Sequence, residues 1–357
     1  MMTNSASRIV WIDWMKAASI MAVVLYHTNM LPEVTTLSYI LCLPAFFFTA
    51  GMFADDSLSF GAYFRKKTVR LLIPYVCFGL LAWLAWLFVG RYYGADAETQ
   101  SAWYEPLIGM LCGTSNSLHH NAPLWFLTCL ISLEWLYFAL SRCRLAIGWQ
   151  IVVLSILAVI GIVLGKEHII LPWGIAAAMI MLPVYWLGRF LAPILKVVAT
   201  SIPMRIVCLI LLIGLLGLGA AYMCNPEIKI SHTQVGNPLL FYIGVLSSIA
   251  VWFALAQIFM RMRAYKLFAF IGSETLWILG LHMPFFGAVK GVTMLMHVPL
   301  SFYNTIVGSL TLWTATFTVL ALGLIPVCRL ALEWIDACRK RAYPGKEQSP
   351  TSQDRSR

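Results

Sequence analysis

Residues 11–30 read WIDWMKAASIMAVVLYHTNM, a largely apolar stretch long enough to cross a membrane as one helix. A transmembrane helix needs about 20 such residues for a hydrocarbon core of about 30 Å. Lys16 and His27 are eleven positions apart in this stretch, so at about 100° per residue they return to within about 20° of one helix face, roughly 16 Å apart. Asp13 falls on the same face. Ionisable groups inside a membrane are costly, which makes this polar stripe a candidate functional site.

The rest of the chain has the same apolar character. Of its 357 residues 61% are hydrophobic and 11% are charged, and the mean hydropathy is +0.81. A soluble domain carries about 25% charged residues. The sequence therefore predicts an all-α polytopic membrane protein. We expect about ten transmembrane helices, at residues 12–31, 37–54, 71–90, 122–141, 148–165, 170–188, 203–223, 239–260, 268–289 and 302–328.

The distribution of positive charge predicts how these helices are oriented. Cytoplasmic loops are enriched in Lys and Arg. With the N-terminus in the cytoplasm, all but four of the 25 Lys and Arg residues fall on the cytoplasmic side, the exceptions being Arg91, Lys166, Lys229 and Lys290. We therefore expect both termini in the cytoplasm. The net charge of +10 then reflects topology, and no basic segment with interleaved aromatic residues indicates nucleic-acid binding.

One domain accounts for nearly the whole chain. We expect an integral membrane domain over residues 8–341 and a polar, disordered cytoplasmic tail over residues 342–357. The first apolar segment has no clear A-x-A cleavage site, and its charged residues are unusual in a signal peptide, so we expect it to be retained as a helix. The sequence leaves the oligomeric state open, a homo-oligomer included.

Nine cysteines are scattered singly along the chain, without a C-x-x-C pair or a Cys/His cluster. This spacing gives no support for a metal site or a redox pair, and we expect no metal. Most of the cysteines are expected to pack as small hydrophobic side chains. A thioester role for one of them has no support from spacing.

His27 is the first candidate catalytic residue. A neutral imidazole can remove the proton from a hydroxyl group that attacks a carbonyl carbon, which is the task of a general base. Lys16 lies closer to the predicted cytoplasmic end of the same helix. It could attract an anionic cofactor or stabilise developing negative charge, or it could be a lysine whose ammonium reaches the membrane interface. Both interpretations of Lys16 stay open.

The run FGAYFRKKTVRLLIPY, residues 60–75, places four basic residues beside a predicted membrane span. Such a run fixes topology and binds lipid headgroups. It could also hold the phosphates of a cytoplasmic cofactor, with Lys67 and Arg70 as ligands.

Two further segments carry ionisable residues inside predicted spans. Glu134, in PLWFLTCLISLEW (residues 123–135), could orient His27, bind an acceptor hydroxyl or hold helices together. His282, in IGSETLWILGLHMPFF (residues 271–286), is a candidate site residue or a polar packing contact. The remaining histidines lie in or beside predicted outer loops and are interpreted as solvated.

These segments, in this order, resemble the acyltransferase 3 family of integral membrane acyltransferases, most closely its sugar O-acetyltransferase branch. The resemblance spans roughly residues 8–330. It rests on Lys16 and His27 with ten residues between them, FFFTAGMF (46–53), Lys67-Thr-Val-Arg70 followed by Pro74, LWFL (124–127), and Ile271, Gly272, His282 and Pro284. Lysine stands at the first basic position of two of these motifs, where arginine is common in the family.

The resemblance implies that the protein transfers an acyl group from cytoplasmic acyl-CoA, usually acetyl-CoA, to a hydroxyl of a cell-surface polysaccharide or a lipid-linked glycan. It implies a place in the bacterial cytoplasmic (inner) membrane, among membrane lipids. By the same resemblance His27 is the catalytic histidine, with Glu134 and His282 as further candidates, and Lys16, Lys67 and Arg70 contribute to the acyl-CoA site. Direct transfer and an acyl-histidine or acyl-cysteine relay both stay open.

Two other classes of function fit the same span count. A secondary transporter for a small anion or sugar would share the intramembrane histidine, lysine and glutamate, but would move its substrate without an acyl donor. A structural or assembly subunit would tolerate apolar residues in place of Lys16, His27 and Glu134.

Overall fold

The computed structural model describes residues 9–28, 32–92, 101–199, 201–225, 228–261 and 265–342. Its regular elements are helices, so the all-α prediction is confirmed; an isolated β-bridge joins Lys229 and Gln234. The predicted tail beyond residue 342 lies outside the described residues. The helices are α1 (Val10–Tyr26), α2 (Pro32–Gly51), α3 (Phe60–Lys67), α4 (Ile73–Phe88), α6 (Glu105–Cys112), α7 (Trp125–Arg142), α8 (Ile147–Lys166), α9 (Ile175–Val198), α10 (Met204–Cys224), α11 (Pro238–Arg261), α12 (Tyr265–Ser273), α13 (Thr275–Leu295), α14 (Ile306–Ala315) and α15 (Ile325–Ala342).

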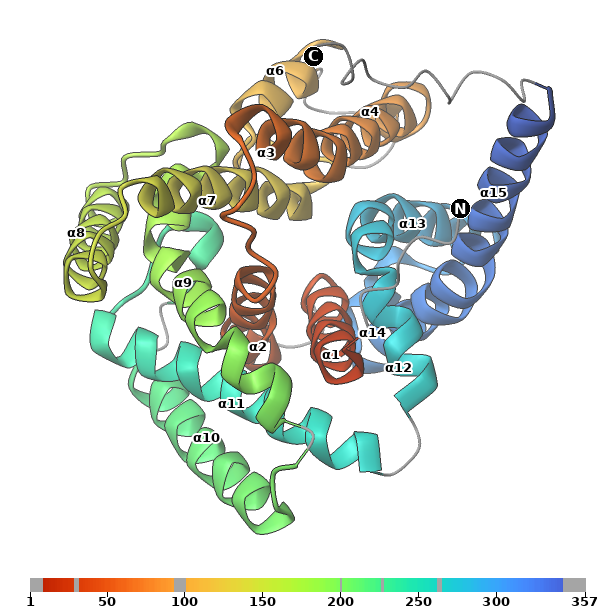
Figure 1. The fold of residues 1–357 in the computed structure, drawn as a ribbon. Coiled ribbons are helices and arrows are strands. Elements are labelled where there is room, and N and C mark those ends of the chain that lie inside the picture. Colours follow the sequence, from red (N-terminus) through yellow and green to blue (C-terminus); the bar gives the residue numbers. More distant parts are fainter. Residues whose placement is uncertain are drawn as a thin grey trace, which may run out of the picture.

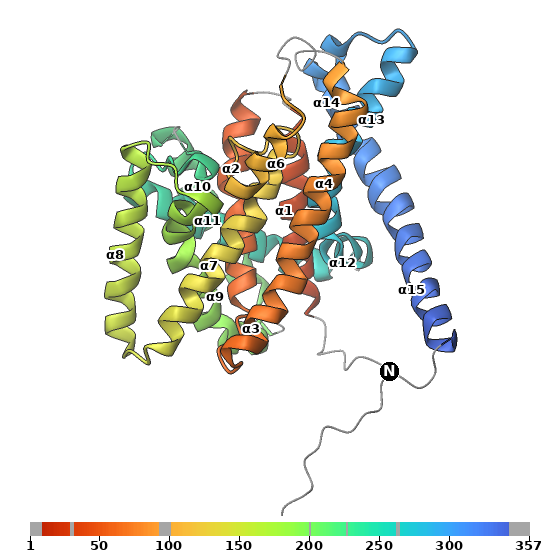
Figure 2. The ribbon, with the colours of Figure 1, turned by 90° about the horizontal axis from the view of Figure 1, so that it is seen from above.

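The long helices form a bundle, and the chain runs up and down along its axis (Figure 2). We name the two ends of this bundle by the helices that lie there. At the α3 end lie α3, the turn between α7 and α8, and the last residues of α15. At the α6 end lie α6 and the connection between α13 and α14 (Figure 2).

Eight helical segments are long and apolar enough to cross a membrane, and they coincide with eight of the ten predicted spans. They are Phe60–Tyr92, Ala122–Arg142, Ile147–Lys166, Pro172–Val198, Met204–Cys224, Pro238–Arg261, Thr275–Leu295 and Ile306–Ala331. The other two predicted spans correspond to α1, of 17 residues, and to α2, whose apolar part is Ile40–Gly51. The count of ten and the side of the termini stay predictions.

Helix α1 occupies the middle of the bundle, with α2 on one side and α13 and α14 on the other (Figure 1). Most of its residues are buried, and its Trp14 ring stacks on Phe259 of α11 and Phe268 of α12, with ring centroids 5.0 and 5.3 Å apart. Gly272 of α12 lies so close to α1 that a Cβ there would overlap the carbonyl oxygen of Asp13. The polar stripe of α1 is therefore enclosed by other helices and does not face lipid.

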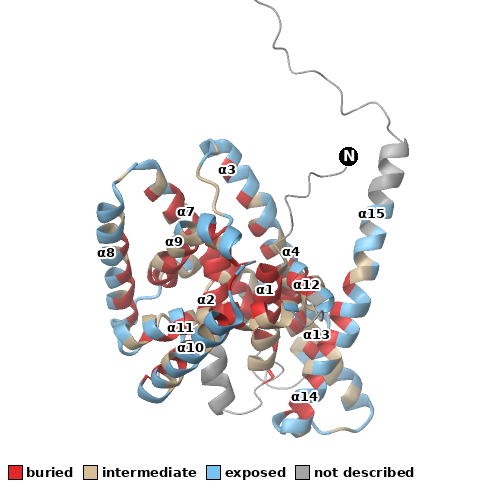
Figure 3. Cartoon of the chain, turned by 60° about the horizontal axis from the view of Figure 1, so that its bottom comes forward, coloured by how far each residue is buried: buried red, intermediate tan, exposed pale blue. Residues whose placement is uncertain are grey.

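The outer helices differ from α1 in which face they bury. In Figure 3 the buried residues gather on α1 and α2, while α8 and α10 expose long stretches on their outward sides. Exposed residues of these two helices include Val159 and Val163 of α8 and Leu212 and Leu216 of α10. An apolar outer surface of this kind is what a helix bundle presents to lipid tails.

Three of the breaks in helical geometry among the described residues lie next to α4, α7 and α13. A π-helical segment, Thr68–Leu72, joins α3 to α4, and a 3₁₀ turn, Ala122–Leu124, leads into α7. Glu274 interrupts the path from α12 to α13; its carboxylate is buried and paired with Arg329 of α15. Such irregular turns are common at functional sites, and two of these three contribute residues to the cavity described next.

Candidate functional site

A cavity of about 390 Å³ runs along the polar stripe of α1. Its lining comes from α1, α2, α7, α13, the π-helical segment Thr68–Leu72, the 3₁₀ turn Ala122–Leu124 and residues of the connecting loops. Toward the α3 end it is lined by Lys16 and Arg70, and toward the α6 end by His27, Ser115 and His232. We call it the main cavity. It connects positive charges at one end of the bundle with an imidazole near the other.

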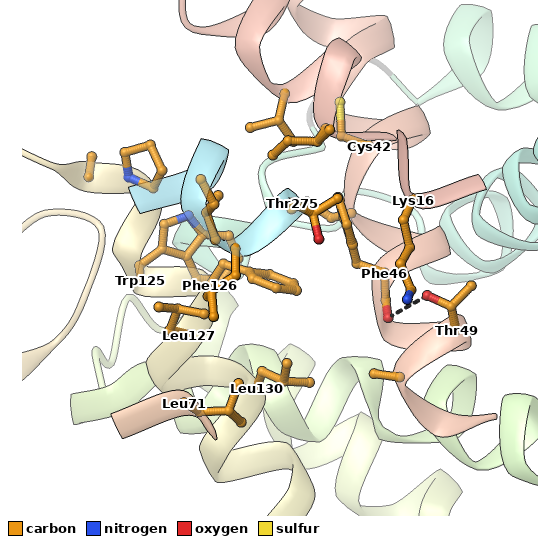
Figure 4. A pocket seen from close by; sticks show the side chains of 18 of the residues that line it. Lys16, Cys42, Phe46, Thr49, Leu71, Trp125, Phe126, Leu127, Leu130 and Thr275 are labelled. Carbon is orange, nitrogen blue, oxygen red and sulfur yellow. Dashed lines mark hydrogen bonds between the residues drawn. The ribbon is translucent and has the colours of Figure 1, made fainter. Parts of the chain in front are cut away.

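The walls between these ends are mostly apolar. Figure 4 shows Lys16 beside Phe46 and Thr49 of α2, with Trp125 and Leu130 of α7 across the cavity. The Thr49 hydroxyl donates a hydrogen bond to the carbonyl oxygen of Phe46 and so is satisfied within its own helix. A long, thin and mainly apolar group therefore fits the middle of the cavity, and a charged head fits only the α3 end.

His27 is placed by the end of α1. The helix ends at Tyr26, and His27 is the C-cap residue, with its backbone N–H bonded to the Val23 carbonyl. His282 of α13 lies beside it: the two ring centroids are 5.3 Å apart and the ring planes meet at 46°. Two residues that are far apart in the sequence are thus neighbours at the same depth of the bundle.

The hydrogen bonding of His282 fixes its tautomer. Its Nδ1 lies 2.9 Å from the carbonyl oxygen of Ile278, which only accepts, so Nδ1 carries the proton. In neutral imidazole Nε2 is then a hydrogen-bond acceptor, and this buried atom has no partner among the described residues. Asn121 holds the same stretch of α13 by donating to the carbonyl oxygen of Gly280 at 2.8 Å. A rigidly held acceptor therefore lies next to His27.

At the α3 end two lysines share one aromatic ring. The Nζ atoms of Lys16 and Lys196 lie 5.5 and 5.1 Å from the centre of the Phe53 ring, and Lys16 also pairs with Asp13 at 3.3 Å. Phe53 and Arg70 both line the main cavity. This end therefore combines several positive charges with an aromatic surface, a combination that suits a polyanionic group carrying a planar ring.

Lys67 and Glu134 lie elsewhere. They form an ion pair between α3 and α7 in which each side chain is 6% exposed, and neither residue lines the main cavity. The hydroxyl of Tyr63, also on α3, donates to the backbone carbonyl of Glu134 at 2.9 Å. The pair therefore ties the helix that precedes Arg70 to α7. The catalytic role predicted for Glu134 and the donor contact predicted for Lys67 stay predictions.

The structure adds cavity residues that sequence reasoning missed. His232, interpreted as a solvated loop histidine, is exposed, and it also lines the main cavity. Its pKa is lowered, mainly by burial and then by the positive charge of Lys229, so the imidazole is neutral at pH 7. Ser115 and Phe53 were not singled out either. Ser115 and His232 lie outside the predicted spans and Phe53 lies at the end of one, just past α2, so hydropathy did not show what these side chains face.

The structure also shows which cysteine lies at the main cavity and whether side chains are grouped to hold a metal. Cys42 of α2 is buried and lines the main cavity, so among the described cysteines it is the one positioned for an acyl relay. Within the described part of the chain, no group of three or more His, Cys, Asp or Glu side chains is arranged to hold a metal ion.

The family model described as an acyltransferase domain, that of acyltransferase 3, matches residues 9–330. The match covers most of the chain, which therefore belongs to the acyltransferase 3 family, as the motifs had indicated. Together with the helices of membrane-spanning length, this makes the protein a multi-pass membrane acyltransferase. A search of curated proteins and a search of solved structures each found no match.

Proposed function

We propose that the protein is an O-acyltransferase that moves an acetyl group from acyl-CoA to a hydroxyl of a cell-surface polysaccharide or lipid-linked glycan. The observation that carries this proposal is the main cavity, which joins Lys16 and Arg70 at the α3 end to His27 and His282. The charge distribution of the sequence puts the α3 end in the cytoplasm, where acyl-CoA is available. In bacteria this membrane is the cytoplasmic (inner) membrane.

The donor is proposed to enter from the α3 end. Its phosphates would lie near Lys16 and Arg70, and its adenine near Phe53, which already contacts two lysine ammonium groups. The pantetheine arm is long and thin and suits the apolar walls formed by Phe46 and Leu130. In this arrangement the thioester reaches the level of His27.

The chemistry at His27 is direct transfer. His27 takes the proton of the acceptor hydroxyl while the hydroxyl oxygen attacks the carbonyl carbon of the thioester. A new C–O bond forms and the C–S bond breaks. The proton then passes from His27 to the departing CoA thiolate. His282 is proposed to orient His27 by accepting a hydrogen bond at its unpartnered Nε2. Under direct transfer Cys42→Ala keeps its activity; a relay through an acyl-Cys42 intermediate predicts its loss.

The experiment uses purified protein in lipid nanodiscs with radiolabelled acetyl-CoA and a glycan-containing membrane fraction. We expect label in alkali-labile esters of the glycan. Arg70→Glu should raise the KM for acetyl-CoA by about tenfold or more with little change in kcat, because it removes a phosphate contact and adds repulsion. Arg65→Glu is the matched control, since Arg65 is exposed on α3 and does not line the cavity.

The alternatives give different results in the same preparation. A secondary transporter accumulates its substrate in vesicles without acetyl-CoA and leaves no label in the glycan. An assembly subunit keeps its cellular function after Lys16, His27 and Glu134 are all replaced by apolar residues. Either result would end the acyltransferase proposal for this site.

A further inference from the structure

A second cavity, of about 110 Å³, lies at the α6 end and meets the main cavity. The two share three lining residues, Ser115, Trp125 and His232. We call these three the junction. The shared walls place the second cavity next to the part of the main cavity that holds His27, on the side opposite to Lys16 and Arg70. The small volume restricts a ligand there to about the size of one sugar ring.

The second cavity has mainly apolar walls, among them Ile169, Ile170 and Leu171, with several uncharged polar side chains between them. It offers hydroxyls from Thr114 and Ser115 and amides from Asn116 and Gln234. None of the described residues that line it is Asp, Glu, Lys or Arg, whereas the main cavity is lined by two cations. His232 contributes a neutral imidazole. Side-chain groups that both donate and accept hydrogen bonds match a ligand that carries several hydroxyls, and they give no compensation for a net charge.

The walls of this cavity are held firmly. Gly165 of α8 lies so close to the loop before α11 that a Cβ there would overlap the carbonyl oxygen of Thr233. The same loop is closed by two backbone hydrogen bonds between Lys229 and Gln234, of 2.9 and 3.1 Å. The Ser231 hydroxyl lies 2.9 Å from Nδ1 of His232 and fixes the orientation of that ring. A pocket that exists before the ligand arrives loses less entropy on binding.

We propose that the second cavity binds the acceptor as a neutral, polyhydroxylated group, a single sugar ring, with one hydroxyl directed through the junction toward His27. The indole of Trp125, which forms part of both cavities, provides a flat surface for the apolar face of the ring. Donor and acceptor then approach His27 from opposite ends of the bundle. This inference rests on the proposed function, which supplies the thioester.

The test is photo-crosslinking of the full-length protein in nanodiscs with diazirine-bearing methyl glycosides of glucose, galactose and N-acetylglucosamine. Mass spectrometry of the peptides should place saturable label in residues 114–116, 168–171 or 231–234, competed by the unmodified glycoside. Gln234→Leu should lower the labelling about fivefold, the effect of one lost hydrogen bond of about 1 kcal/mol. Asn304→Leu is the matched control, an exposed amide at the same end that lines neither cavity.

Saturable label only in other segments, or no saturable label with any of the three probes, would overturn the inference. Equal labelling by the corresponding probe of glucuronic acid would overturn the assignment to a neutral ring. Acetyl-CoA binding is measured in parallel. If acetyl-CoA binds and is consumed while the sugar label falls elsewhere, the acceptor site is wrong and the acyltransferase proposal stands; if acetyl-CoA neither binds nor reacts, the proposed function itself fails.

Discussion

Two of the pairs of ionisable residues in the helix bundle, Lys67 with Glu134 and His27 with His282, are built differently. Lys67 and Glu134 neutralise each other between α3 and α7, away from the main cavity. His27 and His282 lie side by side at the cavity, and Nε2 of His282 has no partner among the described residues. In the sequence, Glu134, His27 and His282 attract attention because ionisable groups are costly inside a membrane, whereas Lys67 attracts attention as part of a basic run beside a span.

The difference shows how to separate a structural polar pair from a reactive one. A buried ion pair whose charges neutralise each other away from the cavity contributes by holding helices together. A buried acceptor without a partner, next to a second imidazole on a cavity wall, can change its bonding when a substrate arrives. The comparison favours tethering for Lys67 and Glu134 and chemistry for His27, and the variants below test both predictions.

The largest effect is expected for His27→Ala. Removing the general base should lower kcat for acetyl transfer on the order of a thousandfold, about 4 kcal/mol in activation free energy, with little change in stability. His119→Ala is the matched control, because His119 is exposed and does not line the main cavity. Transfer at the wild-type rate by a folded His27→Ala protein would remove His27 from the reaction.

The next effect is on stability and concerns the ion pair. Glu134→Leu leaves the Lys67 ammonium buried without its counter-ion, so the free energy of unfolding, measured by SDS titration, should fall by about 3–5 kcal/mol. The double variant Lys67→Met/Glu134→Leu should recover most of this loss and retain acetyl transfer. A well-folded double variant without activity would restore the catalytic role predicted for Glu134 or the donor contact predicted for Lys67.

A smaller effect is expected for His282, the positioning residue. His282→Ala should lower kcat about tenfold, roughly 1.4 kcal/mol, and leave the KM for acetyl-CoA unchanged, because His27 loses its orienting acceptor but the donor site is intact. His282→Gln, which can supply an amide oxygen, should recover part of the rate. Equal losses in stability and in both kinetic constants, without recovery by Gln, would indicate a packing role alone.

The smallest effect is expected at Lys66, which precedes Lys67 and pairs with Asp55 at 3.1 Å on the exposed surface. Lys66→Ala should change the free energy of unfolding by less than about 1 kcal/mol.

The pKa of Asp55 is lowered, chiefly by the hydrogen bond from the Ser57 hydroxyl, with Lys66 contributing. The stabilisation by the charged Asp55 carboxylate is therefore fully present above the pKa of this carboxyl in the unfolded chain. It is lost as the pH falls through the lower pKa of the same carboxyl in the folded protein. SDS titrations between pH 7 and about pH 3 would measure this pH dependence. If Lys66→Ala lowered the free energy of unfolding as much as Glu134→Leu does, the exposed Lys66 would matter as much as the buried Lys67, and the expected difference between the two lysines would be wrong.

Much of the bundle could be predicted because membrane insertion depends on local composition. The eight membrane-length helices overlap eight predicted spans, but several bounds differ. The segment containing α4 starts earlier, at Phe60, since α3 continues into it through the π-helical residues Thr68–Leu72; α9 ends later, at Val198, and α13 is shifted toward the C-terminus, to Thr275–Leu295. The helical period also placed Lys16 and His27 on one face of α1, and both line the main cavity. The partner of Glu134 could not be predicted, because it depends on how α3 packs against α7.

By itself, the sequence determined an all-helical membrane bundle, its family and the ionisable residues buried inside it, since hydropathy and motif spacing are properties of single segments. Only the tertiary structure decided which of those residues meet. It placed His282 beside His27, joined Lys67 to Glu134, and brought His232 from a loop to the junction of two cavities. The physical reason is that a side chain's partner is set by the packing of helices distant in the chain, and many helix arrangements satisfy the same pattern of hydropathy.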